Sequence, residues 1–203
     1  MTVPATAAGR LITPARGVGA VLHAVRVRGP SNTAELERML CEEVQTSLAA
    51  LESQGLLAPS ADTPVRWRLT EAGRARSDEC LRTAQPELAD RLEGPAAEFL
   101  AHDMAVKSLC SAWQDTGAAD GAARWDILAD LEEIVSRVQP ALAAVAGLAP
   151  RFGGYVARLR ESLMLARDDP RHVASPFVDS FHSVWFECHE DLILCRGLER
   201  GAG

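Results

Sequence analysis

The chain has 203 residues, of which 47% are hydrophobic and 24% are charged, and its net charge is −7. This length is enough for one large domain or two small ones, and the composition is that of a globular chain, which excludes a disordered one. No apolar run approaches the roughly 20 residues of a membrane helix, and residues 1–17 hold no long apolar segment of a signal peptide, so we expect no membrane association.

Charge and cysteine content indicate a two-part intracellular protein. Residues 1–76 carry nine arginines against seven acidic residues, whereas residues 77–203 carry twelve basic and twenty-one acidic residues. The acidic second part is expected to repel nucleic acid. Five cysteines, an odd number with no CxxC pair, favour a reducing cytoplasm over a disulfide framework or a zinc ribbon.

The front of the chain predicts three short helices and a β-hairpin. Residues 17–29 form the first helix, Ser31 or Asn32 caps the second, and Gly55 ends the third. Residues 56–69 read as strand, turn and strand, with the turn at 63–64. The expected apolar stripes are Val18, Val21, Leu22 and Val25, then Leu36, Met39 and Leu40, then Val44, Leu48 and Leu51.

Two motifs of this region, L-x-x-L-E-x-x-G-L-L over 48–57 and W-R-L-T-x-x-G-R over 67–74, resemble the winged helix-turn-helix domain of MarR- and PadR-like regulators. The resemblance covers about residues 15–78. It implies a winged-helix fold, with DNA as the expected partner.

The charge of the third helix opposes that partner. Base and phosphate readers are mostly Arg, Lys, Asn and Gln, but residues 41–54 contain no Arg or Lys and three glutamates. Gln45, Thr46 and Ser47 are its neutral polar readers. Arg66 and Arg68 on the hairpin are candidates for phosphate contacts, or are part of a solvated rim.

The back of the chain predicts four or five antiparallel helices, the arrangement of a helical bundle. A connecting helix over 77–92 is interrupted at Pro86, and a long helix over 96–116 begins after Gly94-Pro95. Further helices are expected over 124–138, from Pro140 to 147, over 152–166 and over 177–194.

The segment 175–191, SPFVDSFHSVWFECHED, mixes aromatic residues with acids and histidines, which predicts a helix lining a partly buried polar site. His182 and His189 are seven residues apart and so share a face, about 10.5 Å apart along the axis. Asp103 and Lys107, four residues apart on the long helix, are their expected partners. The predicted ligand-binding residues are His102, Asp103, Lys107, Trp113, Trp185, His182 and His189.

Other chemistries at this segment remain open at the level of sequence. His182, Glu187 and His189 are candidates for acid-base catalysis. The alternative is that they have a purely structural role, in a polar network beside Trp185. No spacing matches a helical metal motif, so we expect neither a metal nor a cofactor.

The back half also carries a resemblance. The pieces from Phe99 to Gln114 and from Asp179 to Leu192 resemble a helical module of actinobacterial proteins related to pyruvate phosphate dikinase, where it also follows a winged-helix segment. The resemblance covers nearly the whole chain and implies a sensor, interaction or accessory module. It does not imply dikinase chemistry, because the chain has no ATP-grasp, phosphohistidine or barrel region.

The sequence therefore predicts a mainly α protein: a winged helix-turn-helix with a small β-wing in residues 1–78, followed by an antiparallel bundle with a polar pocket in residues 79–203. The leading functional hypothesis is a ligand-responsive, cytoplasmic, homodimeric transcriptional regulator that binds a small molecule in the bundle. The alternatives are a small enzyme of specialised metabolism that retains the winged helix as scaffold, and a protein-interaction module.

Overall fold

The computed structural model describes residues 17–116 and 121–197. The described residues are mainly helical, with 75% of them in helices, and they contain one small two-stranded antiparallel sheet. Contacts divide the chain into two compact units, residues 1–86 and 87–203. The expected boundary between 78 and 79 falls inside a helix, a little before this division. No helix of the described part is both long and apolar enough to cross a membrane.

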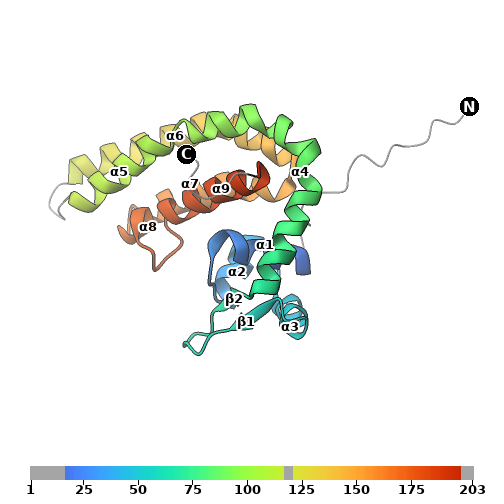
Figure 1. Cartoon of the computed structure of the whole chain (residues 1–203). Coiled ribbons are helices and arrows are strands. Elements are labelled where there is room, and N and C mark those ends of the chain that lie inside the picture. Colours follow the sequence, from blue (N-terminus) through green and yellow to red (C-terminus); the bar gives the residue numbers. More distant parts are fainter. Residues whose placement is uncertain (1–16, 117–120, 198–203) are drawn as a thin grey trace, which may run out of the picture. The chain divides into compact units, whose positions relative to one another are not determined.

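From residue 17 onwards, the first unit contains three helices, the sheet and the start of a long helix (Figure 1). The elements are α1 (Val18–Arg28), α2 (Thr33–Leu40), α3 (Gln45–Ser53), β1 (Leu57–Pro59), β2 (Trp67–Leu69) and α4 (Glu71–Leu100). The strands pair antiparallel with Leu57 opposite Leu69, and Ser31 forms an isolated bridge with Trp67. The segment between α1 and α2 therefore joins the free edge of β2.

The core of the first unit follows the predicted stripes. Val44, Leu48 and Leu51 are fully buried, as is Leu36, whereas Val18 is 39% exposed at the start of α1. Asn32 caps α2 in a capping box: its side chain accepts from the Glu35 N–H, and the Glu35 carboxylate accepts from the Asn32 N–H.

The backbone at Gly73 lies very close to the backbone at Leu56. A Cβ atom at position 73 would lie 1.9 Å from the carbonyl oxygen of Leu56. The Thr70 hydroxyl fixes the same junction, because it donates to the Gly55 carbonyl at 2.7 Å and accepts from the Gly73 N–H at 3.0 Å. Only glycine fits where the first turn of α4 passes the backbone at Leu56, directly before β1.

The long helix α4 is continuous, so the predicted interruption at Pro86 and the predicted new start at Gly94-Pro95 are both wrong. A proline inside a helix removes one hydrogen bond and costs about 3 kcal/mol. Leu92, Ala96 and Phe99 are each fully buried on either side of Pro95, and burial of a large apolar side chain contributes about 1.5–3 kcal/mol. Tertiary burial thus outweighs the local preference there.

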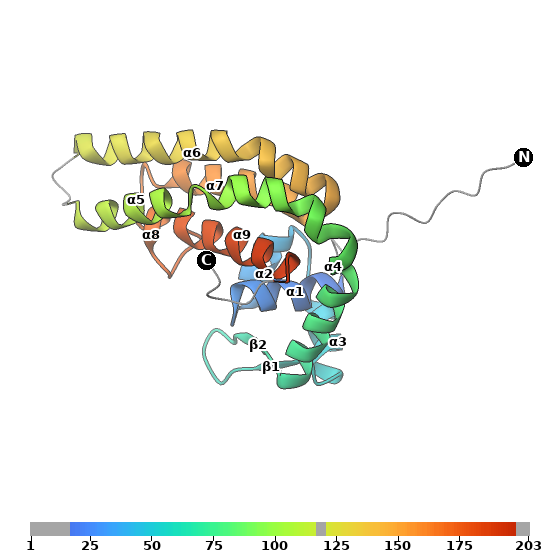
Figure 2. The ribbon, with the colours of Figure 1, turned by 45° about the horizontal axis from the view of Figure 1, so that its top comes forward.

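The second unit is built from α-helices that lie side by side (Figure 2). After α4 come α5 (Asp103–Asp115), α6 (Gly121–Leu148), the 3-10 turn η1 (Pro150–Gly154), α7 (Tyr155–Leu165), α8 (Arg171–Ala174) and α9 (Phe181–Cys195). Helix α6 contacts α5 and α7, and α9 contacts α7, α8 and α5.

Other helix boundaries also differ from the sequence prediction. Helix α6 runs through Pro140, because Val138 and Ala141 beside it are buried. A break at 101–102 divides the helix expected over 96–116, so α5 begins at Asp103. Helix α9 begins after Ser180, whose side chain accepts a hydrogen bond from the Ser183 N–H, and not at Phe177.

Candidate functional site

A polar cluster lies where α5 meets α9, centred on the carboxylate of Asp103. The indole N–H of Trp185 donates to Asp103 Oδ1 at 3.1 Å. Lys107 Nζ lies 2.6 Å from Asp103 Oδ2, and His189 Nε2 lies 4.0 Å from the same oxygen. The structure therefore brings together four of the seven predicted ligand-binding residues, which we call the Asp103 cluster.

Local sequence explains how this cluster is positioned. The break at 101–102 places Asp103 in the first turn of α5, where a negative charge interacts favourably with the helix dipole. Lys107 follows one turn later. Trp185 stacks on Phe99, with ring centroids 4.2 Å apart. This stacking holds the indole N–H in the orientation that donates to the Asp103 carboxylate.

The surroundings of Asp103 keep its side chain ionised. Partial burial opposes the charge, but the hydrogen bonds from Lys107 and Trp185 and the nearby His189 together hold the pKa of this carboxyl below its ordinary value of 3.8. Nδ1 of His189 is buried without a hydrogen-bond partner among the described residues. The cluster thus presents a fixed carboxylate, one ammonium group and an imidazole.

Replacing Asp103 with asparagine tests this electrostatic role, because the amide oxygen still accepts from Trp185. The folded-state pKa of Asp103 is lowered, so its contribution to stability is complete above the unfolded-state pKa near 4 and is lost as the pH falls through the folded-state value. We expect Asp103→Asn to cost up to about 1 kcal/mol at pH 7, since the lysine is exposed. In urea titrations the difference from wild type should shrink towards pH 3; a difference independent of pH would contradict the electrostatic role.

The other three predicted ligand-binding residues lie apart from the cluster. His102 lines a surface groove of about 360 Å³ between α5 and α6, together with Asp130, Glu133 and Arg137. Trp113 is buried and donates from its indole N–H to the Pro170 carbonyl at 3.1 Å. His182 is exposed near the start of α9.

The predicted acid-base set does not converge on one point either. Glu187 is five residues from His182, which places it about 140° around the helix axis. It is 2% exposed, and its Oε2 forms an ion pair with Arg158 Nη2 at 2.7 Å. Glu187 therefore faces α7, away from the Asp103 cluster.

A second buried ion pair lies beside the first, and sequence reasoning missed both. Arg151 donates to both oxygens of Asp191, with Nη2 at 2.7 Å from Oδ1 and Nε at 2.9 Å from Oδ2. Tyr155 also donates to Asp191, at 3.3 Å. Burial opposes the charge of Arg151, but the Asp191 carboxylate raises the pKa of the guanidinium above its ordinary value.

The spacing of these charges is a signal that the sequence contains. Glu187 and Asp191 are four residues apart and so share one face of α9, and Arg151 in η1 precedes Arg158 in α7 by seven residues. Because η1 and α7 run antiparallel to α9, the first arginine pairs with the second acid and the second arginine with the first acid.

The cysteines near this network are protonated and unreactive. Cys188 and Cys195 are buried, and burial together with Asp191 raises the pKa of Cys195 to about 12 and that of Cys188 well above its ordinary value. Neither thiol carries the thiolate that nucleophilic chemistry requires.

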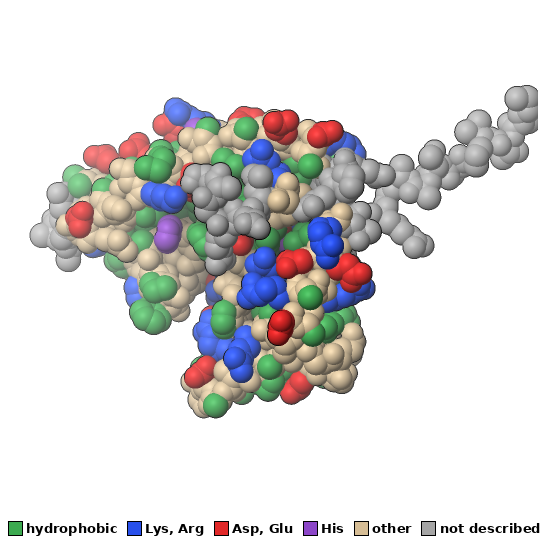
Figure 3. Space-filling view, in the orientation of Figure 1, with side chains coloured by type: hydrophobic (Ala, Val, Ile, Leu, Met, Phe, Trp, Pro, Cys, Tyr) green, Lys and Arg blue, Asp and Glu red, His purple; other side chains and the backbone are tan. Residues whose placement is uncertain are grey.

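The predicted nucleic-acid readers lie on the first unit. Gln45 and Thr46 are exposed at the beginning of α3, while Ser47 is half-buried. Arg68 is exposed on β2, and Arg66 is turned towards the segment between α1 and α2. Figure 3 shows basic side chains gathered on one face of this unit.

Comparisons of the chain with protein-family models, with curated proteins and with solved structures find no match. Within residues 17–116 and 121–197, no three His, Cys, Asp or Glu side chains are grouped so that they could hold a metal ion.

Proposed function

We propose that the first unit is a winged helix-turn-helix domain that binds DNA, and that the protein is a ligand-responsive transcriptional regulator. The order of elements carries this proposal: α1, a short extended segment, α2, α3 and a two-stranded hairpin. The isolated bridge between Ser31 and Trp67 supports it most directly, because it places the extended segment beside β2, at the position of the third strand in a winged helix.

Within this proposal α3 is the recognition helix and the hairpin is the wing. The first residues of a recognition helix contact base edges, and Gln45 and Thr46 are the exposed polar side chains at that end of α3. Because α3 lacks Arg and Lys, attraction to the phosphate backbone comes from arginines outside it. Arg68 is the exposed one on β2.

The Asp103 cluster is the proposed small-molecule site in the second unit. Its charged groups are partly open to solvent, since Lys107 is 57% and His189 23% exposed. Phe186, which stacks on His189 with ring centroids 6.4 Å apart, is also partly exposed. A small molecule with polar groups and an apolar part suits this surface. We further propose that the regulator acts as a homodimer, in which two α3 helices reach half-sites one DNA turn apart.

Arg68→Ala tests the assignment of the wing. A duplex carrying the region upstream of the protein's own gene is labelled, and its binding is followed by fluorescence anisotropy between 50 and 200 mM salt. Loss of one phosphate contact should weaken binding and reduce the slope of log K against log[salt] by about 0.9.

The matched control is Arg137→Ala, which removes an exposed arginine of the second unit and should leave binding unchanged. If wild-type protein binds neither this duplex nor a random one at 50 mM salt, the DNA-binding proposal is wrong. If Arg137→Ala weakens binding as much as Arg68→Ala does, the wing is not the contact.

A further inference from the structure

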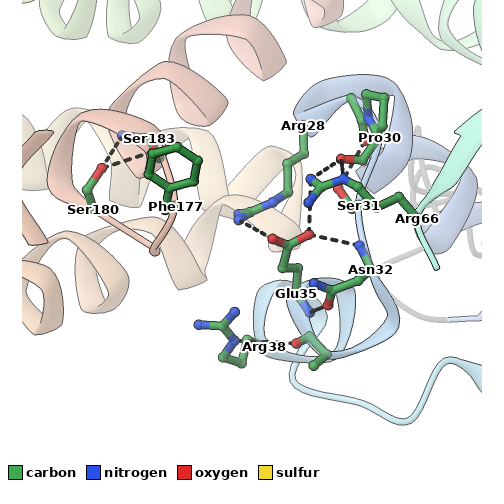
Figure 4. A network of polar contacts seen from close by, with 12 residues as sticks. Arg28, Pro30, Ser31, Asn32, Glu35, Arg38, Arg66, Phe177, Ser180 and Ser183 are labelled. Atoms are coloured by element: carbon green, nitrogen blue, oxygen red, sulfur yellow. Dashed lines mark hydrogen bonds and ion pairs between the residues drawn. The ribbon is translucent and has the colours of Figure 1, made fainter. Parts of the chain in front are cut away.

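The side chain of Glu35 lies between two arginines of the first unit (Figure 4). Its Oε2 is 3.4 Å from Arg66 Nη2, and its Oε1 is 3.9 Å from Arg28 Nη2. Glu35 is largely buried, with 16% of its side chain exposed. One carboxylate thus faces two of the cations of a unit whose recognition helix has none.

Arg66 is held at this point by a second acceptor. Its Nε donates to the Pro30 carbonyl at 3.1 Å, and its Nη2 donates to the same oxygen. Arg66 immediately precedes β2. Pro30 lies between α1 and α2, and Glu35 lies in α2. These contacts fasten the base of the hairpin to the start of α2, so we call them the Glu35 latch.

The ion pairs of the Glu35 latch weaken the attraction of the first unit for phosphate. DNA affinity rises with the number of cations that neutralise phosphates, because each contact releases counterions. An arginine paired with an internal carboxylate has to leave that carboxylate before it can neutralise a phosphate. Glu35 therefore competes with DNA for Arg28 and Arg66.

We infer that Glu35 is an internal regulator of DNA binding, which holds the hairpin closed on α2 and withholds Arg28 and Arg66 from the phosphate backbone. This inference rests on the proposed function. In the latched state Arg68 is the main phosphate contact of the hairpin. Release of the ion pairs adds up to two cationic contacts, while the backbone bridge between Ser31 and Trp67 keeps the hairpin in place.

Glu35→Gln isolates the charge of the latch. Glutamine serves as well as glutamate at the third position of a capping box, so the variant keeps the hydrogen bond from the Asn32 N–H and the start of α2. The variant removes only the attraction for the two guanidinium groups. Circular dichroism melts of the full chain check that it folds like wild type.

The experiment measures binding of the full chain to a labelled random-sequence 20-bp duplex between 50 and 200 mM salt. Glu35→Gln should bind roughly threefold to tenfold more tightly at 100 mM salt, with a slope steeper by about 0.9 for each arginine released. Glu35→Gln combined with Arg66→Ala should lose at least half of the added slope.

The matched control is Glu43→Gln, which makes the same change of net charge at an exposed position just before α3. It should leave the salt slope at the wild-type value, because the slope counts cationic contacts and no arginine is released. If Glu35→Gln binds the duplex as tightly as the wild-type protein and with the same salt slope, the Glu35 latch is wrong and the DNA-binding proposal still stands. Absence of binding by both proteins overturns the proposed function as well.

Discussion

Replacing Asp191 with alanine is expected to lower the unfolding free energy of the second unit by about 3–5 kcal/mol, the cost of leaving a buried charge unpaired. Asp191 is 1% exposed and Arg151 is 10% exposed, and two hydrogen bonds shorter than 3 Å join them. Without the carboxylate, the guanidinium stays away from water, above the Phe152 ring and with the neutral Cys195 sulfur as an acceptor at 2.6 Å. Urea titration followed by tryptophan fluorescence measures the loss, because Trp113, Trp125 and Trp185 all lie in this unit.

An exposed ion pair supplies the control for that experiment. Glu133 and Arg137 are both about 60% exposed on α6, so Glu133→Ala should change the unfolding free energy by less than about 1 kcal/mol. The double variant Arg151→Met with Asp191→Leu should recover most of the loss, since apolar residues of similar volume replace buried ion pairs at little cost. If Asp191→Ala and the double variant lose the same unfolding free energy, the unpaired charge of Arg151 is not the cause of the destabilisation.

Gly73→Ala is expected to destabilise the first unit by about 3 kcal/mol, at the upper end of the range for overpacked positions. The added methyl group would overlap the Leu56 carbonyl at 1.9 Å. The overlapping atom belongs to the backbone and cannot move to another rotamer as a side chain can. The junction of α4 with the hairpin therefore has to open. Hydrogen–deuterium exchange read on peptides from α1 and α3 should show faster exchange than in wild type.

Gly94→Ala is the matched substitution in the same helix. Nothing lies within 4 Å of a Cβ atom at position 94, so alanine should stabilise α4 by up to about 1 kcal/mol through its better helix propensity. If Gly73→Ala leaves hydrogen exchange in α1 and α3 unchanged, the prediction that the Leu56 carbonyl leaves no room for a methyl group at position 73 is wrong.

Local patterns predicted the local structure well. The Asn32 cap, the stop at Gly55 and the buried stripe of α3 depend on residues within one or two turns, and each is as expected. The helix boundaries at Pro95 and Pro140 were wrong because burial of neighbouring residues outweighs the preference of proline. That burial depends on distant parts of the chain.

The candidate site was predictable to the extent that helical spacing determines it. The pairing of Lys107 with Asp103 follows from their separation of four residues, and the expected approach of Asp103 to His189 depended on which faces of α5 and α9 meet. The break at 101–102 turned His102 towards α6, which no local pattern indicated. Sequence reasoning missed Arg151 and Arg158 because it followed histidines and aromatic residues and not the matched spacing of opposite charges.

The chain contains a single lysine, Lys107, and it belongs to the Asp103 cluster. Its amine is therefore the only side-chain amine in the protein, and it is 57% exposed. An amine-reactive fluorophore has one side-chain target, which lies 2.6 Å from the carboxylate at the centre of the proposed ligand site. The protein thus offers a natural position for an optical reporter, and compounds can be screened against the site without any engineered cysteine.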